Sequence, residues 1–158
     1  MRVEARRATD DDLEVLVDLY RLLEDEMTIL HPMWPIADGL NIPIESSMKE
    51  LLEDPDTVVV VGTVDDFPFG FMTATVEGLL DQAAGERVGS IRLVFVDHGA
   101  REIGVGEAMR DVVLAELRER GITKFDAHVL PGHRLVKNFF ESGGFSARSI
   151  IMHHDDRR

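Results

Sequence analysis

The stretch that decides the fold leads from an apolar strand pattern into an amphipathic helix pattern: Val94-Phe95-Val96-Asp97-His98-Gly99-Ala100-Arg101-Glu102-Ile103-Gly104-Val105-Gly106-Glu107. Gly104 and Gly106 remove side chains where the predicted helix begins, so backbone N–H groups there can converge on an anion. The helix dipole adds positive potential, and Arg101 supplies a mobile charge. The stretch predicts a site for a phosphate-bearing ligand; the alternative is a tight strand-to-helix turn without a ligand.

Two familiar phosphate motifs are excluded in this stretch. No Lys followed by Ser or Thr comes after the second glycine, as a nucleotide P-loop requires. The three-glycine fingerprint of dinucleotide-binding proteins is also missing. The phosphate-bearing ligand is therefore expected to be of another kind.

Around this stretch, hydrophobic periodicity predicts a β-α-α-β-β-β-α-β-α-β order. The first helix starts at Thr9-Asp10-Asp11-Asp12 and stops at His31-Pro32, since proline lacks an N–H. The predicted strands are residues 2–8, 57–64, 69–79, 88–96, 123–130 and 145–153, and the later helices are residues 43–53, 103–120 and 133–142. Short links between the second, third and fourth strands favour an antiparallel meander, and the later strand-helix-strand unit is expected to be parallel. The prediction is an α/β (α+β) fold with a mixed, mostly antiparallel sheet flanked by helices, in one domain over residues 1–158.

Composition excludes several classes of function. The 158 residues hold 17 Lys and Arg and 30 Asp and Glu, and 17 − 30 gives a net charge of −13. This balance repels nucleic acid. The absence of cysteine excludes disulfides, thiol catalysis and thiolate zinc sites. With neither the apolar core of a secretory signal nor a long apolar run, we expect a cytoplasmic protein without a membrane span.

The charge is unevenly distributed along the chain. Residues 1–97 hold 7 basic and 21 acidic residues, net −14, whereas residues 98–158 hold 10 and 9, net +1. The first part is suited to attract a cation and the second to tolerate an anion. The alternative is that the surface acid only keeps the protein in solution.

The glycine-containing stretch resembles the main signature of the GNAT superfamily of acyl-CoA-dependent N-acyltransferases, Q/R-x-x-G-x-G/A after a strand. Arg101-Glu102-Ile103-Gly104-Val105-Gly106 fits it fully. The segment His133-Arg134-Leu135-Val136-Lys137-Asn138-Phe139-Phe140-Glu141-Ser142-Gly143-Gly144-Phe145 partly matches the second signature, N-x-x-A-x-x-f-Y-e-k-x-G-F. Together with the predicted element order, the resemblance spans nearly the whole chain.

The resemblance implies that acetyl-CoA enters an opening between the strand ending at Val96 and the strand ending at Leu130. Its pantetheine is then expected to pair with the backbone at Val94 and Val96, and its pyrophosphate to meet N–H groups between Glu102 and Glu107. The cofactor-binding residues implied in this way are Val94, Val96, Arg101, Glu102, Ile103, Gly104, Val105, Gly106, Glu107, His133 and Phe140.

The chain departs from the family pattern at four positions. His133 replaces Asn, Val136 replaces Ala, Glu102 replaces a common Gly, and Phe140 replaces the Tyr that often protonates the departing thiolate. Phe cannot donate a proton. Either another acid or water serves, or the thiolate leaves unaided, which its pKa of about 8.5 permits.

The catalytic residues are not identified by the sequence. Glu77 and His133 are candidates for the general base that deprotonates the amine, and His98 and His128 are also available. For Glu77 the alternative is a solvent-facing strand carboxylate, and for His98 a structural role in the loop.

Candidates for binding the acceptor amine lie between the first two helices. Glu26, His31 and Trp34 are expected to line a pocket, with Glu24 and Asp25 orienting a cation. The alternative is that Trp34 and its neighbours form a hydrophobic plug over the core. His153-His154-Asp155-Asp156 is not predicted to bind a metal, because neighbouring strand residues point to opposite faces.

The sequence therefore predicts an N-acetyltransferase that transfers an acetyl group from acetyl-CoA to a primary amine of a small cationic molecule or peptide. The alternatives are a weakly active or inactive CoA-binding sensor or interaction module, and a purely structural domain. We expect an amine acceptor and no nucleic-acid, membrane or metal partner, and homodimer formation is left open.

Overall fold

The computed structural model describes residues 1–157 and divides the chain into two compact units, Met1–His128 and Val129–Arg158. Each unit is described by itself. Within the described residues, no helix combines the length and apolar character needed to cross a membrane. The single domain expected over residues 1–158 stays a prediction.

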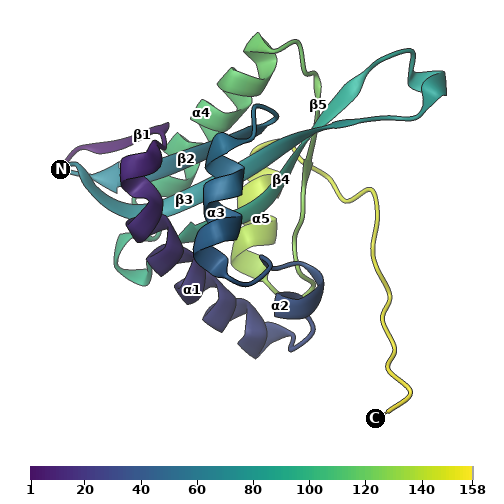
Figure 1. Cartoon of the computed structure of the whole chain (residues 1–158), viewed down its shortest axis with the longest axis horizontal. Helices are drawn as coiled ribbons and strands as arrows, with labels where there is room; N and C mark the ends of the chain where they lie inside the picture. Colours follow the sequence, from purple (N-terminus) through teal and green to yellow (C-terminus); the bar gives the residue numbers. More distant parts are fainter. Residues whose placement is uncertain (158) are drawn as a thin grey trace. The chain divides into compact units, whose positions relative to one another are not determined.

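The first unit is built on a five-stranded sheet with the strands in chain order (Figure 1). The strands are β1 (Val3–Arg7), β2 (Thr57–Val64), β3 (Phe67–Gly78), β4 (Arg87–Val96) and β5 (Lys124–Ala127). The first four pair antiparallel, and β5 pairs parallel to β4. The apolar β-branched run at residues 57–64 forms a buried inner strand of this sheet, as its composition favours.

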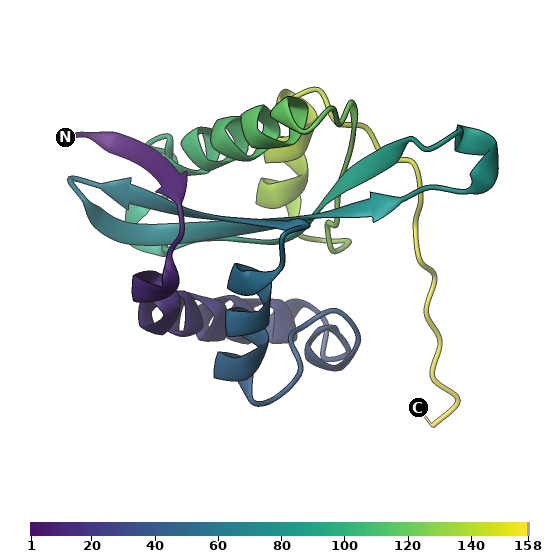
Figure 2. The ribbon, with the colours of Figure 1, turned by 45° about the horizontal axis from the view of Figure 1, so that its top comes forward.

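Helices cover both faces of this sheet (Figure 2). The helices α1 (Leu13–Leu30) and α3 (Ile44–Glu53) lie on one face, and α4 (Val105–Glu119) lies on the other. The short α2 (Trp34–Ala37) and the 3₁₀ turns Asp10–Asp12, Asp81–Ala83 and His98–Ala100 lie in the connections. This layering buries one stripe of each long helix against the sheet.

The start of α1 is fixed to the sheet by charge. The guanidinium of Arg6 in β1 donates to both carboxylate oxygens of Asp12, each at 2.8 Å, and the backbone N–H of Thr9 donates to the same carboxylate. The hydrogen bond from Arg6 is the main reason that the pKa of Asp12 is lowered. Such bidentate pairs fix direction as well as position.

Glycines let α4 lie close to the sheet. A Cβ atom added to Gly62 would lie 2.6 Å from Val105 and 2.9 Å from Met109, at the first turns of α4. One added to Gly89 would lie 2.6 Å from Leu117, near its end. The two glycines therefore set the height of α4 over the sheet at its two ends.

The second unit contains α5 (Arg134–Ser142). The ring of Phe140 packs edge-on against Phe139 at 5.0 Å and Phe145 at 5.2 Å between centroids. The imidazole of His133 accepts a 3.4 Å hydrogen bond from the N–H of Val136 at the start of this helix. A histidine ring thus caps α5 in the manner of a short polar side chain.

Most predicted elements are confirmed within one or two residues, including the antiparallel meander and the parallel pair. The strand predicted at 123–130 is shorter, and α2 was not expected. The last strand, predicted at 145–153, is wrong for this structure: those residues form neither helix nor strand. A strand exists only as part of a hydrogen-bonded ladder, and within residues 1–157 the sheet ladders do not include this segment.

Candidate active site

The site is built where β4 and β5 stop pairing. Their register runs from Val88–Lys124 to Ile91–Ala127, and the N–H of His128 donates to the carbonyl of Ile91. A bulge in the pairing of β3 with β4 lies at the same level, between Thr73 and Ala74. Bulges bend a strand and end regular pairing, so β4 runs on beyond Ile91 without β5 beside it.

The free edge of β4 presents backbone groups. The N–H of Asp97 donates to Phe69 in β3, and alternate strand residues direct their backbone groups to opposite sides. The groups of Val94 and Val96 therefore face away from β3. An extended ligand chain lying there has a strand edge to pair with, as expected for these two residues.

The loop after β4 ends in a helix start with free donors. The first helical hydrogen bond of α4 runs from Ala108 to Gly104. The N–H groups of Val105, Gly106 and Glu107 have no acceptor among residues 1–157. A Cβ at Gly104 would meet nothing within 4 Å, so this helix start is open to an anion. These features fit a pyrophosphate group.

The backbone of this loop is unusual at two positions. Gly104 has a φ of 99°, which suits glycine, but Glu102 has a φ of 66°, in the left-handed region that favours glycine. Residues with a side chain rarely adopt this backbone conformation. The replacement of the family's common Gly by Glu102 therefore puts strain, and a negative charge, into the loop expected to hold a phosphate.

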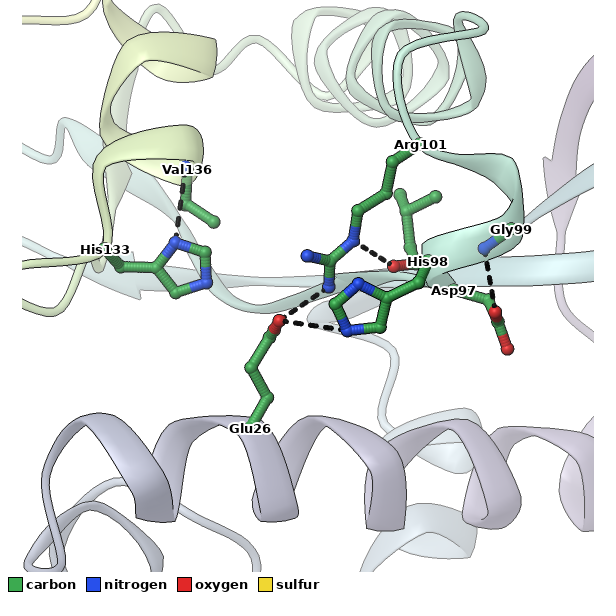
Figure 3. Close-up of polar contacts among 8 residues, drawn as sticks. Glu26, Asp97, His98, Gly99, Arg101, His133 and Val136 are labelled. Atoms are coloured by element: carbon green, nitrogen blue, oxygen red, sulfur yellow. Dashed lines mark hydrogen bonds and ion pairs between the residues drawn. The ribbon is translucent and has the colours of Figure 1, made fainter.

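Arg101 is held by its own chain (Figure 3). Its Nε donates to the carbonyl of Val96 at 2.8 Å, and its second terminal nitrogen donates to a carboxylate oxygen of Glu26 in α1 at 2.7 Å. Its guanidinium also lies 5.7 Å from the centre of the Phe95 ring. The sequence predicts that Arg101 is a mobile partner for a phosphate, whereas the structure shows it as a fixed link between the loop and α1. Its hydrogen bond to Val96 also occupies the carbonyl of that residue.

Two further groups complete this cluster. The Nε2 of His98 lies 3.7 Å from the same oxygen of Glu26, and its side chain is 76% exposed. The carboxylate of Asp97 accepts from the N–H of Gly99 and so holds the turn that carries His98. Glu26 thereby links the helix expected to meet the acceptor with the loop expected to meet the acyl donor.

The general-base candidates of the first unit differ in their surroundings. Glu77 accepts a 2.7 Å hydrogen bond from Arg92, which ties its carboxylate to a cation. His128 follows β5 at the point where the two strands separate. Partial burial of its ring, together with the nearby positive charge of Arg92, lowers the pKa of His128. The lowered pKa favours the neutral imidazole, which is the form that can accept a proton.

The structure gives His128 a feature that its residue type alone does not show. It stood among four candidates by composition alone, although its place at the end of a short strand in a parallel pair was a usable signal. In parallel sheets, the residues at the carboxyl ends of strands commonly meet ligands.

The acceptor candidates are partly buried by packing. Trp34 is 6% exposed and stacks obliquely on Tyr20 with ring centres 6.3 Å apart. Burial raises the pKa of Tyr20 to about 12. Its hydroxyl donates to Glu24 and accepts from the N–H of Leu40. His31 accepts from the N–H of Met33 just after α1. This packing favours the plug interpretation for Trp34 and leaves Glu26 as the acceptor candidate beside the loop.

The candidates of the second unit have local roles. His133 caps α5, and Phe140 is 3% exposed within the cluster of aromatic rings. Their predicted contacts with the cofactor remain predictions. Within residues 1–157, no group of three or more His, Asp or Glu side chains is arranged to hold a metal ion.

Comparison with known proteins identifies the family. Residues 16–145 match the model of the acetyltransferase (GNAT) family. The chain belongs to this family. The resemblance of its two motifs is thereby confirmed, and the protein is an acetyltransferase whose acyl donor is acetyl-CoA. The match spans the boundary between the two units.

Solved structures share the fold at low sequence identity. Aminoglycoside N-acetyltransferase AAC(6')-Iy, in complex with the bisubstrate analogue CoA-S-monomethyl-acetylneamine, has a TM-score of 0.75 and 16% identity, with 100% of both chains covered. The aminoglycoside acetyltransferase meta-AAC0020 from an uncultured soil metagenomic sample has a TM-score of 0.74 and 18% identity, over 97% of this chain and 94% of that one.

A third similar structure is the ribosomal-protein-alanine N-acetyltransferase from Brucella melitensis biovar Abortus 2308, with a TM-score of 0.71 and 18% identity. The match covers 98% of this chain and 100% of that one. A search of curated proteins finds no match. The similar structures include enzymes named for quite different amine acceptors, so the shared fold alone does not select one.

Proposed function

We propose that the protein N-acetylates a primary amine of a small cationic molecule or peptide, by direct attack of the amine on the acetyl-CoA thioester. The observation that carries this proposal is the open edge of β4 continuing into the free N–H groups at the start of α4. The backbone groups of Val94 and the N–H of Val96 would hold the pantetheine, since Arg101 occupies the Val96 carbonyl, and the N–H groups of Val105, Gly106 and Glu107 would hold the pyrophosphate. Both lie on rigid elements, which favours accurate positioning.

Acidic side chains near this edge support a cationic acceptor. Glu24, Asp25 and Glu26 follow one another on the second half of α1, and Glu26 adjoins the loop through Arg101. Carboxylates attract and orient ammonium groups. Aminoglycoside acetyltransferases and a ribosomal-protein-alanine N-acetyltransferase are among the structurally similar proteins, and we place the acceptor among small cationic amines and peptide amines.

His128 is our candidate for the general base. The acceptor reaches the enzyme as an ammonium ion and must lose a proton before its nitrogen can attack. The lowered pKa of His128 keeps the imidazole neutral at pH 7, so it can take the proton directly or through water. The nitrogen–carbon bond then forms, and the nitrogen gives up its second proton to water. The carbon–sulfur bond breaks, and the sulfur leaves as thiolate.

Phe140 has no phenol that could protonate this thiolate. The thiolate is weakly basic, so it can leave without being protonated.

We also propose that residues 1–158 act as one catalytic domain in a reducing, cytoplasmic setting. The absence of cysteine agrees with such a setting.

The test is acetyl-CoA turnover against a panel of amines: an aminoglycoside, a polyamine, a peptide with a free α-amine and a neutral-tailed amine. Because the chain has no cysteine, a thiol reagent detects only released CoA. We expect release with a cationic amine, and its loss in Gly104→Val, in which a side chain enters the open helix start.

CoA binding without release for any amine would contradict catalysis and favour the sensor module. No CoA binding at all would favour a structural domain. Binding is measured separately by calorimetry on the wild-type chain.

A further inference from the structure

The turn after α2, formed by residues 38–40, is built on the buried phenol of Tyr20. The Tyr20 hydroxyl accepts a 2.8 Å hydrogen bond from the N–H of Leu40, and the Tyr20 ring stacks on Trp34. A Cβ atom added to Gly39 would lie 2.6 Å from the same hydroxyl oxygen, so the backbone of the turn lies directly on the phenol. These contacts fix the turn relative to α1.

Asp38 is the charged residue of this turn. Its N–H donates to the carbonyl of Trp34 at 2.8 Å, which holds its backbone. The residue is exposed, and no hydrogen bond or ion pair engages its carboxylate within residues 1–157. By contrast, the carboxylates of Glu24, Glu26 and Glu77 already have partners in the chain. Asp38 therefore presents two acceptor oxygens to a ligand from a fixed turn.

The side chain of His128 faces the layer that contains this turn. The ring of Phe125 in β5 lies 5.4 Å from the guanidinium of Arg118, so Phe125 faces α4. The N–H of His128 continues the pairing of β5 with β4, and strand residues alternate between the two faces. His128 therefore faces the opposite side, where α1, α2 and α3 form one layer (Figure 2).

The charge of Asp38 acts on the His128 ring. Burial of the ring and the charge of Arg92 lower the pKa of His128. Three carboxylates act in the opposite direction, those of Asp126, Glu77 and Asp38. The charged groups around the ring thus come from β3, β4, β5 and the turn after α2. The influence of Asp38 agrees with the layering, which places its turn on the side that the ring faces.

A carboxylate in this place is suited to a cation that does not react. An opposite charge favours the protonated form of an ammonium group, so a carboxylate bound to the reacting amine would oppose the loss of its proton. His128, in its neutral form, instead removes that proton. Asp38 and His128 are therefore suited to two different nitrogens of one acceptor.

We propose that Asp38 binds a second cationic group of the acceptor, so that the preferred substrate is a small molecule with at least two ammonium groups. Tyr20 is the positioning residue that holds Asp38 in place through the turn. This inference rests on the proposed function, in which His128 is the general base. It favours small polycationic amines over peptides whose α-amine is their only positive charge.

The first experiment compares putrescine, which carries two ammonium groups, with butylamine, which carries one. Asp38→Asn should lower kcat/KM for putrescine by about three- to fivefold, the effect of a well-formed exposed ion pair, and leave kcat/KM for butylamine unchanged. Asp38→Glu keeps the charge and should retain most of the activity with putrescine. Asp81→Asn is the matched control, because it removes the same charge from an exposed residue at the tip of the β3–β4 hairpin, which projects from the sheet (Figure 1). It should change neither value.

The second experiment tests the anchor of the turn. Tyr20→Phe keeps the ring that stacks on Trp34 but leaves the N–H of Leu40 without its acceptor. It should lower kcat/KM for putrescine more than for butylamine and leave the dissociation constant of CoA unchanged. Trp34 is the only tryptophan, so its emission spectrum checks that the stacking is preserved.

Two results would overturn the proposal: an unchanged kcat/KM for putrescine in Asp38→Asn, or an equal loss for both amines. An unchanged preference in Tyr20→Phe would overturn the positioning role of the phenol. If the wild-type chain acetylates no amine, the proposed function fails, and calorimetry on the CoA complex tests this inference without turnover. Asp38→Asn should then weaken putrescine binding and not butylamine binding, and the lack of this difference would contradict the second cation site.

Discussion

Glu26 of α1 and Arg101 of the loop after β4 form a 2.7 Å ion pair, although 75 positions separate them in the sequence. Both side chains are only about a fifth exposed, at 21% and 22%. In the family signature this arginine begins the phosphate-binding loop. In this chain its charge is already matched by a carboxylate, so a phosphate must compete with Glu26 for it.

Glu26→Gln should therefore tighten CoA binding. A partly exposed ion pair contributes up to about 1 kcal/mol, so removing the competitor lowers the dissociation constant by up to about fivefold. The same change should raise the KM for a cationic amine, because the carboxylate nearest the loop is lost. Calorimetry measures the first effect and steady-state kinetics the second.

Asp25→Asn is the matched control for this prediction. It removes the same charge from an exposed neighbour on α1 and should leave CoA binding unchanged. Weaker CoA binding in Glu26→Gln would instead mean that the ion pair holds Arg101 in its binding position.

Glu102→Gly should relieve the strain in the loop. Left-handed backbone at a residue with a side chain costs about 1–2 kcal/mol. Glycine removes this cost from the folded state, but it also makes the unfolded chain more flexible, which offsets part of the gain. A net gain of about 1 kcal/mol raises the melting temperature by about 2–4 °C in a chain of this size. Differential scanning calorimetry measures it.

Glu102→Gln separates strain from charge. It keeps the strained backbone, so its melting temperature should stay near wild type, while CoA binding should strengthen in both variants because a negative charge leaves the phosphate site. A lower melting temperature for Glu102→Gly would show that the Glu102 side chain stabilises the loop more than its backbone strains it.

His128 should set the acid limb of the pH profile. Its pKa lies below the usual histidine value of about 6.5, so the neutral base is present at pH 7 and activity should fall only at lower pH. The folded state binds the His128 proton less tightly than the unfolded state. The stability that His128 contributes is therefore fully present above the pKa of the unfolded state, and it is lost as the pH falls from there through the lower pKa of the folded state.

His128→Gln should remove this acid limb and reduce kcat by about 100-fold or more, the usual contribution of a general base. The KM for the amine should change little. Glu77→Gln is the comparison, since Glu77 is tied to Arg92 and we expect a smaller effect on kcat. If Glu77→Gln abolishes the acid limb and His128→Gln does not, the roles are reversed.

Local sequence predicts the parts of this molecule that depend on neighbours in the chain. The strand at residues 57–64 is found as predicted, because its β-branched run and flanking turns act locally. The loop from Asp97 to Gly104 was also located, since two glycines and a helix start suffice to mark it. Contacts between distant segments, such as Glu26 with Arg101, leave no trace in spacing or composition.

The missed features have the same origin. Residues 145–153 have the composition of a strand, but pairing requires a partner edge that the segment itself does not contain. Trp34 is an aromatic residue of the kind that lines pockets, yet the ring of Tyr20, on a different helix, helps to bury it. The pKa of His128 is lowered by burial of its ring and by the charge of Arg92, which a different strand supplies.

The two glycines under α4 separate stability from cofactor binding. Gly62→Ala places a Cβ 2.6 Å from Val105, whose β-branched side chain rotates little, at the turn that presents the free N–H groups. The start of α4 must shift. We expect a loss of about 1–3 kcal/mol of stability, the usual cost of overpacking, together with weaker CoA binding.

Gly89→Ala is the matched change at the other end of the helix. Its Cβ would lie 2.6 Å from the tip of Leu117, a flexible side chain three turns away from the N–H groups. It should cost less stability and leave CoA binding unchanged. Thermal unfolding and calorimetry of both variants give the comparison. Equal CoA affinity in Gly62→Ala and wild type would contradict the site, because it would mean that the start of α4 does not hold the cofactor.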